Sequence, residues 1–245
     1  MLNPAPTCEI ASPEAAEVAR LAAEYRRRAE RIPPDFYGWR RPVNQFAFCQ
    51  TLRASIGALV EAGCFPFDRR RIADIGCGSG KWLLEFVQWG ADPLNLAGID
   101  LDERRVEEAR SRLPTADLRV GHAGRLPWPA ESFDLVTQFT LFTSVLNPVV
   151  KQSIAREMLR ILKPGGAVLW YDFAVNNPHN PNVRGIGARE IRSLFAGCTI
   201  RLRRTELAPP LARLVVPVSW MLGLLLEKVW FLRTHYLGVF RKPAG

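Results

Sequence analysis

The residues with the clearest chemical pattern lie at positions 72–82, where the sequence reads IADIGCGSGKW. Gly76, Gly78 and Gly80 alternate with small residues, and Asp74 stands two positions before the first of them. Glycine permits positive φ angles and lets a ligand lie against bare backbone. A helix that starts after such a loop offers unpaired N–H groups to a polar ligand. We therefore expect a strand, a ligand-binding loop and a helix in succession here.

The spacing of these glycines differs from that of two phosphate-binding loops. A dinucleotide-binding loop, G-x-G-x-x-G, would place its third glycine at position 81, where the chain has lysine. A P-loop would end in Gly-Lys-Ser or Gly-Lys-Thr, but Gly80-Lys81 is followed by Trp82. The pattern that fits is acid-x-G-x-G-x-G, in which Asp74 supplies the acid.

Short apolar segments alternate with helix-forming segments from residue 71 onward, and these elements must position the loop. The expected strands are 71–75, 94–99, 117–120, 133–138, 166–173, 199–207 and 237–241. The expected helices are 80–88, 102–112, 147–162, 189–195 and 211–232. Such alternation is typical of a parallel sheet with helices on both faces. We therefore predict an α/β, doubly wound fold with a seven-stranded, mostly parallel sheet.

Two parts of the chain lie outside this alternation. Residues 1–70 read as helices, one from about Pro13 and one opened by Pro42, and we predict a helical cap in front of a ligand-binding domain, 71–245. The segment of about 211–234 is helical and apolar and precedes the last strand. We expect both parts to contribute to a lid over the ligand.

The chain of 245 residues carries a formal net charge of +9, with arginine clusters at 26–28, 69–71 and 201–204. An anionic partner and an ordinary solvated face are both consistent with these clusters. No aromatic residues interleave them, as binding of single-stranded nucleic acid would require, so we predict no nucleic-acid partner.

The five cysteines are odd in number and form no CxxC pair, so neither a disulfide framework nor a zinc site is expected. With no secretory signal at the N-terminus, this favours a cytoplasmic protein. Residues 214–226 contain no charge but are shorter than the roughly 20 residues of a membrane span. A buried helix or lid is favoured for them, and contact with a membrane surface stays open.

Together, Asp74 and the three glycines resemble the signature of the class I S-adenosylmethionine-dependent methyltransferases. The resemblance covers 71 to about 207 and is closest to the small-molecule branch that includes ubiquinone-biosynthesis-like enzymes. It implies a Rossmann-like sheet, S-adenosylmethionine as cofactor and S-adenosylhomocysteine as product. No pair of acids with a histidine indicates a metal site, so none is expected. Further segments that match the family are 98–102, 126–129, 132–136 and 162–166.

The resemblance also implies roles for residues around the loop. Asp74 would face the ammonium group of the cofactor, and Asp100 would accept hydrogen bonds from both ribose hydroxyls, while Asp102 is read as a helix cap. Backbone at Gln138 would contact the methionyl part. The complete predicted set of cofactor-binding residues is Asp74, Gly76, Cys77, Gly78, Gly80, Asp100, Leu101, His122, Ala123 and Gln138.

His122 departs from the family, which usually has an aspartate before Ala123 to receive the adenine amino group. A neutral imidazole can accept one hydrogen bond from that group, and it can also stack. We therefore keep His122 in the predicted adenine pocket, with the alternative that another residue does this work.

The acceptor side is expected at the end of the fifth strand. Asp172 and His179 are the candidate catalytic residues for binding or deprotonating the acceptor, and His235 is expected to be structural or exposed. Lid aromatics would include Tyr25 and Phe36. The predicted substrate-binding residues are Tyr37, Trp39, Thr143, Asn176 and Trp220.

These features predict an enzyme that methylates a small molecule, with a hydroxyl oxygen favoured, in secondary-metabolite or glycan biosynthesis. Methylation of nitrogen or carbon in a natural product, methylation of RNA, and a non-catalytic cofactor-binding scaffold are the alternatives. In-line methyl transfer needs close approach and exclusion of water above all. A base is needed only where the acceptor must lose a proton.

Overall fold

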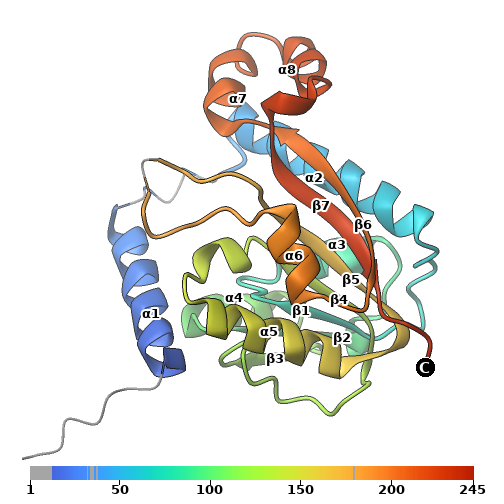
Figure 1. Ribbon diagram of the computed structural model, residues 1–245. Helices are drawn as coiled ribbons and strands as arrows, with labels where there is room; N and C mark the ends of the chain where they lie inside the picture. The colour runs from blue at the N-terminus through green and yellow to red at the C-terminus, as the bar shows by residue number, and fades with distance from the viewer. Residues whose placement is uncertain (1–12, 32, 34–35, 37, 179) are drawn as a thin grey trace, which may run out of the picture.

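The computed structural model describes residues 13–31, 33, 36, 38–178 and 180–245 (Figure 1). Its centre is a seven-stranded sheet with the order β3-β2-β1-β4-β5-β7-β6. The strands are β1 (Ile72–Ile75), β2 (Leu96–Asp100), β3 (Asp117–Val120), β4 (Phe133–Phe139), β5 (Leu162–Phe173), β6 (Thr199–Leu207) and β7 (Arg233–Arg241). The first five pair in parallel, whereas β7 runs antiparallel to both β5 and β6. The predicted fold class is confirmed.

Helices cover both faces of this sheet (Figure 1). They are α1 (Pro13–Arg31), α2 (Pro42–Glu61), α3 (Lys81–Gln88), α4 (Glu103–Arg112), α5 (Pro148–Ile161), α6 (Ala188–Leu194), α7 (Pro209–Val215) and α8 (Trp220–Glu227). Buried side chains of α2, α3 and α4 join one core cluster, and those of α1, α5 and α6 join another. On β5, Trp170 packs in the second cluster and Tyr171 in the first, because successive strand residues face opposite sides.

Near the ligand-binding edge, two helices begin at residues whose side chains cap them, as the sequence indicates. Asp102 accepts hydrogen bonds from the backbone N–H groups of Arg104 and Arg105, so its reading as a helix cap is confirmed. Asn147 caps α5 in the same way, just before Pro148. These caps fix where α4 and α5 begin, directly after the segments that follow β2 and β4.

The predicted continuous helix over 211–232 is wrong. The structure has α7, then a break at 216–219, then α8 and a 3-10 turn, η3 (Trp230–Leu232). Pro217 has no N–H to donate and its ring disfavours a helix interior, so the first helix ends before it. Ser219 then starts α8 by accepting a hydrogen bond from the Leu222 N–H. The last strand also begins earlier than predicted, at Arg233.

The helices before residue 70 pack on the rest of the fold. α2 contacts β6 and β7, and α1 contacts α5. The division of the chain at residue 70 stays a prediction. What the structure adds is that both helices reach the edge where the parallel strands end, which is where ligands bind in open α/β sheets.

Candidate cofactor and acceptor site

The glycine loop joins β1 to α3 with three residues in left-handed backbone. Gly76, Gly78 and Gly80 have φ angles of 80°, 51° and 76°, which disfavour residues with a side chain. A Cβ atom at Gly78 would collide with the guanidinium of Arg105, which lies across the loop. Both reasons for glycine that the sequence suggested, positive φ and close approach, are therefore present.

Asp100, at the end of β2, holds the loop in place. One carboxylate oxygen accepts from the Gly78 N–H at 2.8 Å and the other from the Asp102 N–H at 3.0 Å. The side chain is buried. Each oxygen can accept a further hydrogen bond, so the group can bind a pair of hydroxyls while it anchors the loop.

Asp74 lies beside the loop at the end of β1 and is 2% exposed. Burial raises the pKa of this carboxyl to about 7, although the hydrogen bond from the Thr137 hydroxyl, 2.8 Å long, favours the ionised form. A positive group placed beside Asp74 would offset the cost of burying its charge. This environment suits a ligand ammonium.

Cys77 faces away from the ligand side of the loop. Its thiol is buried in the cluster beneath α3 and α4, where a Cβ at Gly98 would lie 2.8 Å from its sulfur. Burial raises the pKa of the thiol, so it stays protonated. Only the backbone of Cys77 can contribute to ligand binding at this position.

A small cavity joins the predicted ribose and adenine residues. It is lined by Leu21, Tyr25, Gly76, Ile99, Asp100, Leu101, Gly121, His122, Ala123, Leu141, Val145 and Ile154. The structure therefore brings together Gly76, Asp100, Leu101, His122 and Ala123, which the sequence places in three separate segments.

His122 lines this cavity, and one of its ring nitrogens has no hydrogen-bond partner among the described residues. Its Nδ1 accepts from the Gly124 N–H at 3.2 Å, and its buried Nε2 makes no hydrogen bond. Burial lowers the pKa of the imidazole, so the neutral form dominates. In a neutral imidazole with Nδ1 accepting, Nε2 carries the proton. The geometry therefore makes Nε2 a hydrogen-bond donor, whereas the prediction gave the imidazole an acceptor role.

Helix α1 covers the cavity, and its contribution was only partly predicted. Leu21 and Tyr25 line the space, which is reduced to about 20 Å³. Glu17 accepts from the Leu146 N–H at 2.6 Å, and Arg20 donates to the Ser144 carbonyl at 2.5 Å. The spacing of residues 17, 21 and 25 by four marks one helix face, and this signal could have placed α1 on the site.

Asp172, near the end of β5, is engaged by the segment after β4 and by its own strand neighbour. It accepts from the Thr143 N–H at 3.1 Å, from the Thr143 hydroxyl, and from the Phe173 N–H at 2.9 Å. Burial raises its pKa to about 7. The Gln138 side chain is similarly occupied, by the Leu141 N–H and the Tyr171 carbonyl. These contacts give both residues a positioning role for the loop that borders the cavity.

The remaining predicted substrate residues are not gathered around the cavity. Tyr37 and His179 lie outside the described residues. Asn176 is exposed and accepts from the Gly185 N–H at 2.9 Å, which closes its own loop. Trp39 is largely exposed, and Trp220 packs edge-on against Phe46 of α2.

Aromatic side chains line the ends of β4 and β5 instead. Trp82, in the first turn of α3, stacks on Phe139 with ring centroids 3.8 Å apart, and Phe139 lies 6.0 Å from Tyr171. Trp82 and Phe139 are partly exposed. They form an apolar wall next to the glycine loop.

Behind this wall lies a buried polar cluster that the sequence did not reveal. The hydroxyls of Tyr171 and Thr51 donate to Glu206, and His235 Nδ1 lies 3.9 Å from the same carboxyl. Burial raises the pKa of Glu206 to about 8 and lowers that of His235 to about 3. The group is therefore neutral in the folded protein at neutral pH.

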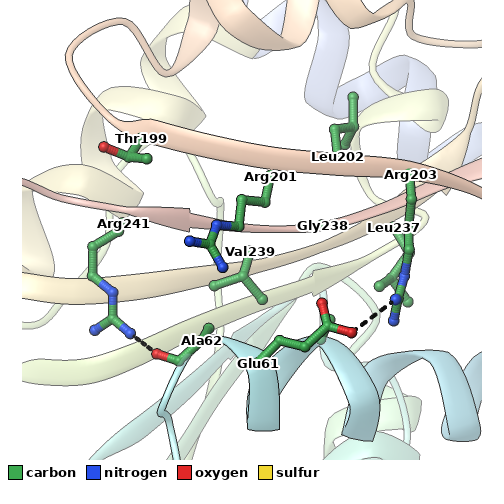
Figure 2. Close-up of a pocket in the computed structure, with 11 residues that line it drawn as sticks. Glu61, Ala62, Thr199, Arg201, Leu202, Arg203, Leu237, Gly238, Val239 and Arg241 are labelled. Atoms are coloured by element: carbon green, nitrogen blue, oxygen red, sulfur yellow. Dashed lines mark hydrogen bonds and ion pairs between the residues drawn. The ribbon is translucent and has the colours of Figure 1, made fainter.

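A larger cavity, of about 380 Å³, lies between α2 and the edge strands β6 and β7 (Figure 2). Glu61 pairs with Arg203 there, and Arg241 donates to the Ala62 carbonyl. Thr199 and Arg241 mark the strand edge opposite the glycine loop. This cavity therefore lies toward the sheet edge away from the glycine loop, and we do not take it as the candidate site although it is the larger of the two cavities described.

Fold and site together resemble a class I S-adenosylmethionine-dependent methyltransferase domain: β7 runs antiparallel between β5 and β6, and the glycine loop meets an acid at the end of β2. The comparison with protein families agrees. Residues 72–166 match the family model described as a methyltransferase domain.

Similar proteins of known sequence carry the same domain. The chain is 29% identical over 119 residues to a demethylmenaquinone methyltransferase of Listeria welshimeri, covering 46% of this chain and 47% of that protein. It is 31% identical over 109 residues to a 27-O-demethylrifamycin SV methyltransferase of Amycolatopsis mediterranei, covering 42% and 38%. The chain thus spans less than half the length of these relatives.

Solved structures show the fold. A S-adenosylmethionine-dependent methyltransferase from Methanosarcina mazei superposes with a TM-score of 0.59 at 20% identity, over 76% of this chain and 98% of that one. At this identity the likeness concerns the fold alone. Among the described residues, no helix is both long enough and apolar enough to cross a membrane.

Proposed function

We propose that this protein transfers a methyl group from S-adenosylmethionine to a small-molecule acceptor, with a hydroxyl oxygen as the favoured atom. One observation supports the proposal: His122, whose buried Nε2 has no partner among the described residues, and the loop-anchoring Asp100 line one cavity beside a glycine loop. An orphaned buried nitrogen is costly unless a ligand satisfies it.

The residues present fit this cofactor. Asp74 would hold its ammonium group, Asp100 its ribose hydroxyls, and His122 with the Ala123 backbone its adenine. When bound, the cofactor supplies an electrophilic methyl group. The chain's own contribution is to fix both reactants on one line and to exclude water, which can account for about 7–11 kcal/mol of a barrier in favourable cases.

The acceptor is proposed to lie against Trp82 and Phe139. Their stacked, partly exposed rings at the end of β4 favour an aromatic or otherwise apolar molecule. The names of the two relatives support a small-molecule acceptor, since each denotes methylation of a small molecule. A pathway in secondary metabolism is part of this proposal.

For a hydroxyl acceptor, Asp172 is proposed to act through Thr143 and the segment after β4, which it holds by two hydrogen bonds. A base, where one is needed, would come from His179 on the adjoining loop. His179→Ala should then lower turnover most at low pH, because less acceptor is ionised there without help from the enzyme.

The first test is binding of S-adenosylhomocysteine, which should raise the melting temperature of the full chain because it binds only the folded state. The second is transfer of labelled methyl groups to a panel of phenols, alcohols and amines, with RNA included as the rival acceptor. Binding without transfer to any class would favour a cofactor-binding scaffold. The absence of binding would overturn the proposal.

A further inference from the structure

The segment between β6 and β7 presents apolar side chains to solvent. Six of them are more than half exposed: Leu214, Val218, Met221, Leu225, Trp230 and Phe231. Elsewhere in the described chain, large apolar side chains with this much exposure occur singly, on separate elements. An exposed apolar surface that is continuous in sequence and rich in large side chains marks an interaction surface.

These side chains all belong to one small lobe, residues 209–232. In α8, Met221, Leu222, Leu225 and Lys228 recur with helical spacing and are exposed, whereas Gly223 packs inward on Val216 and Phe46. α7 and α8 project beyond the sheet next to the start of α2 (Figure 1). We call this exposed side of residues 209–232 the apolar lobe face.

The charges around the apolar lobe face are positive. Residues 209–233 contain one acid, Glu227, which is buried and faces Arg53 at 3.4 Å. Lys228 and Arg213 are exposed. Arg213 and Arg41 both lie over the ring of Phe36, at 5.8 and 5.1 Å, which places a second cation beside α7.

We propose that the apolar lobe face docks on an anionic lipid membrane surface. Exposed aliphatic and tryptophan side chains next to lysine and arginine match the boundary between lipid chains and acidic headgroups. A second copy of the chain fits less well, because a symmetric contact would bring the same cations together. Neither α7 nor α8 is long enough to span a bilayer, so the contact is superficial.

Docking on a membrane does not itself depend on the proposed methyl transfer, but it would bear on how an acceptor arrives. β6 ends and β7 begins at the same sheet edge as the glycine loop, so docking would turn the ligand-binding edge toward the membrane. An apolar acceptor dissolved in lipid could then reach Trp82 and Phe139 without crossing water.

The test is cosedimentation of the full chain with vesicles of phosphatidylcholine alone and of phosphatidylcholine mixed with phosphatidylglycerol. The protein should pellet with the anionic vesicles, and raising the salt from about 0.1 M to about 0.5 M should weaken this. Met221→Gln with Leu225→Gln should lower partitioning by about tenfold or more. The control Leu94→Gln, an exposed leucine at the opposite sheet edge, should not change it.

The charge is tested separately. Lys228→Glu should lower partitioning by about tenfold, and the matched control Arg69→Glu, on another exposed cation, should have little effect. Unchanged binding of S-adenosylhomocysteine in each variant shows that the fold is intact. Equal binding to neutral vesicles, no binding to either kind, or a dimer that Met221→Gln with Leu225→Gln dissociates would each overturn the proposal.

Discussion

Two buried polar regions lie at the same edge of the sheet, and they differ in what satisfies them. Around the glycine loop, Asp100 takes only one backbone N–H on each oxygen, and His122 keeps a free Nε2. Around Glu206, the hydroxyls of Tyr171 and Thr51 are already in place. The first region has hydrogen-bonding capacity left for a ligand, whereas the second uses its capacity within the protein.

This difference indicates that the glycine-loop region can contribute to ligand binding, whereas the Glu206 cluster contributes to the stability of the fold. Buried polar groups that lack partners need a ligand, while satisfied ones fix the positions of the strands that carry them. Substitutions in the first region should therefore change affinity, and those in the second should change stability. Four measurements would break or sharpen this contrast.

The largest effect is expected for Glu206→Gln on the pH dependence of stability. Glu206 has a pKa of about 8 in the fold, against an ordinary value of 4.5. Its contribution is fully present below the lower value and is lost as the pH rises through the higher one. The parent should thus lose about 4 kcal/mol of unfolding free energy across this window relative to the variant.

Urea unfolding of both proteins between about pH 5 and pH 8 measures this difference. Glu107→Gln, on the exposed side of α4, is the control and should keep the slope of the parent. If the unfolding free energies of the parent and of Glu206→Gln changed with pH by the same amount, Glu206 would not be buried in its protonated form.

The next effect concerns affinity for S-adenosylhomocysteine. Asp100→Ala should weaken binding by about 100-fold, since hydrogen bonds to a charged group are worth about 1.5–3 kcal/mol each. Asp100→Asn keeps the shape of the side chain and separates loss of charge from loss of the loop anchor. Asp92→Ala, which removes a cap far from the loop, should bind like the parent in calorimetry. Equal affinity in Asp100→Ala would remove this residue from the ribose site.

A smaller effect should follow protonation of Asp74. Its pKa of about 7 implies that a ligand ammonium must compete with a proton as the pH falls. Affinity for S-adenosylhomocysteine should therefore fall by about tenfold per pH unit below pH 6. Asp74→Asn should bind more weakly and lose this dependence, and a flat profile in the parent would contradict the ammonium assignment.

The smallest effect is expected at His122. His122→Leu removes the hydrogen-bond donor and should weaken binding of S-adenosylhomocysteine by about fivefold, which corresponds to one ordinary hydrogen bond. His122→Gln keeps a hydrogen-bond donor, so its affinity for S-adenosylhomocysteine should stay close to that of the parent. The reverse order of the two variants would restore the acceptor role that the sequence suggested.

The glycine-loop region could be predicted because its parts are contiguous in sequence. Asp74 to Gly80 is one short segment, and backbone N–H groups, which every such loop offers, make its contacts. Asp100 follows the next strand at a regular interval. Local patterns of this kind also place most of the strands and the cap at Asp102.

The Glu206 cluster could not be predicted, because its members come from separate elements. Thr51 and Glu206 are 155 positions apart, and only the pairing of β6 with β7 brings His235 beside them. Likewise, nothing local shows that Arg105 lies across the loop. The break at Pro217 could have been predicted from the proline itself. The prediction of one continuous helix instead followed the uncharged segment around it.

The attachment of α1 has a consequence for the proposed exchange of cofactor and product. A space of about 20 Å³ cannot admit a molecule that ordinarily needs a few hundred. On the proposed function, Glu17 and Arg20 would release their backbone partners each time product is exchanged for fresh cofactor. These contacts would then limit the rate of product release. Substitutions that loosen them should speed product release and shorten the lifetime of the bound complex.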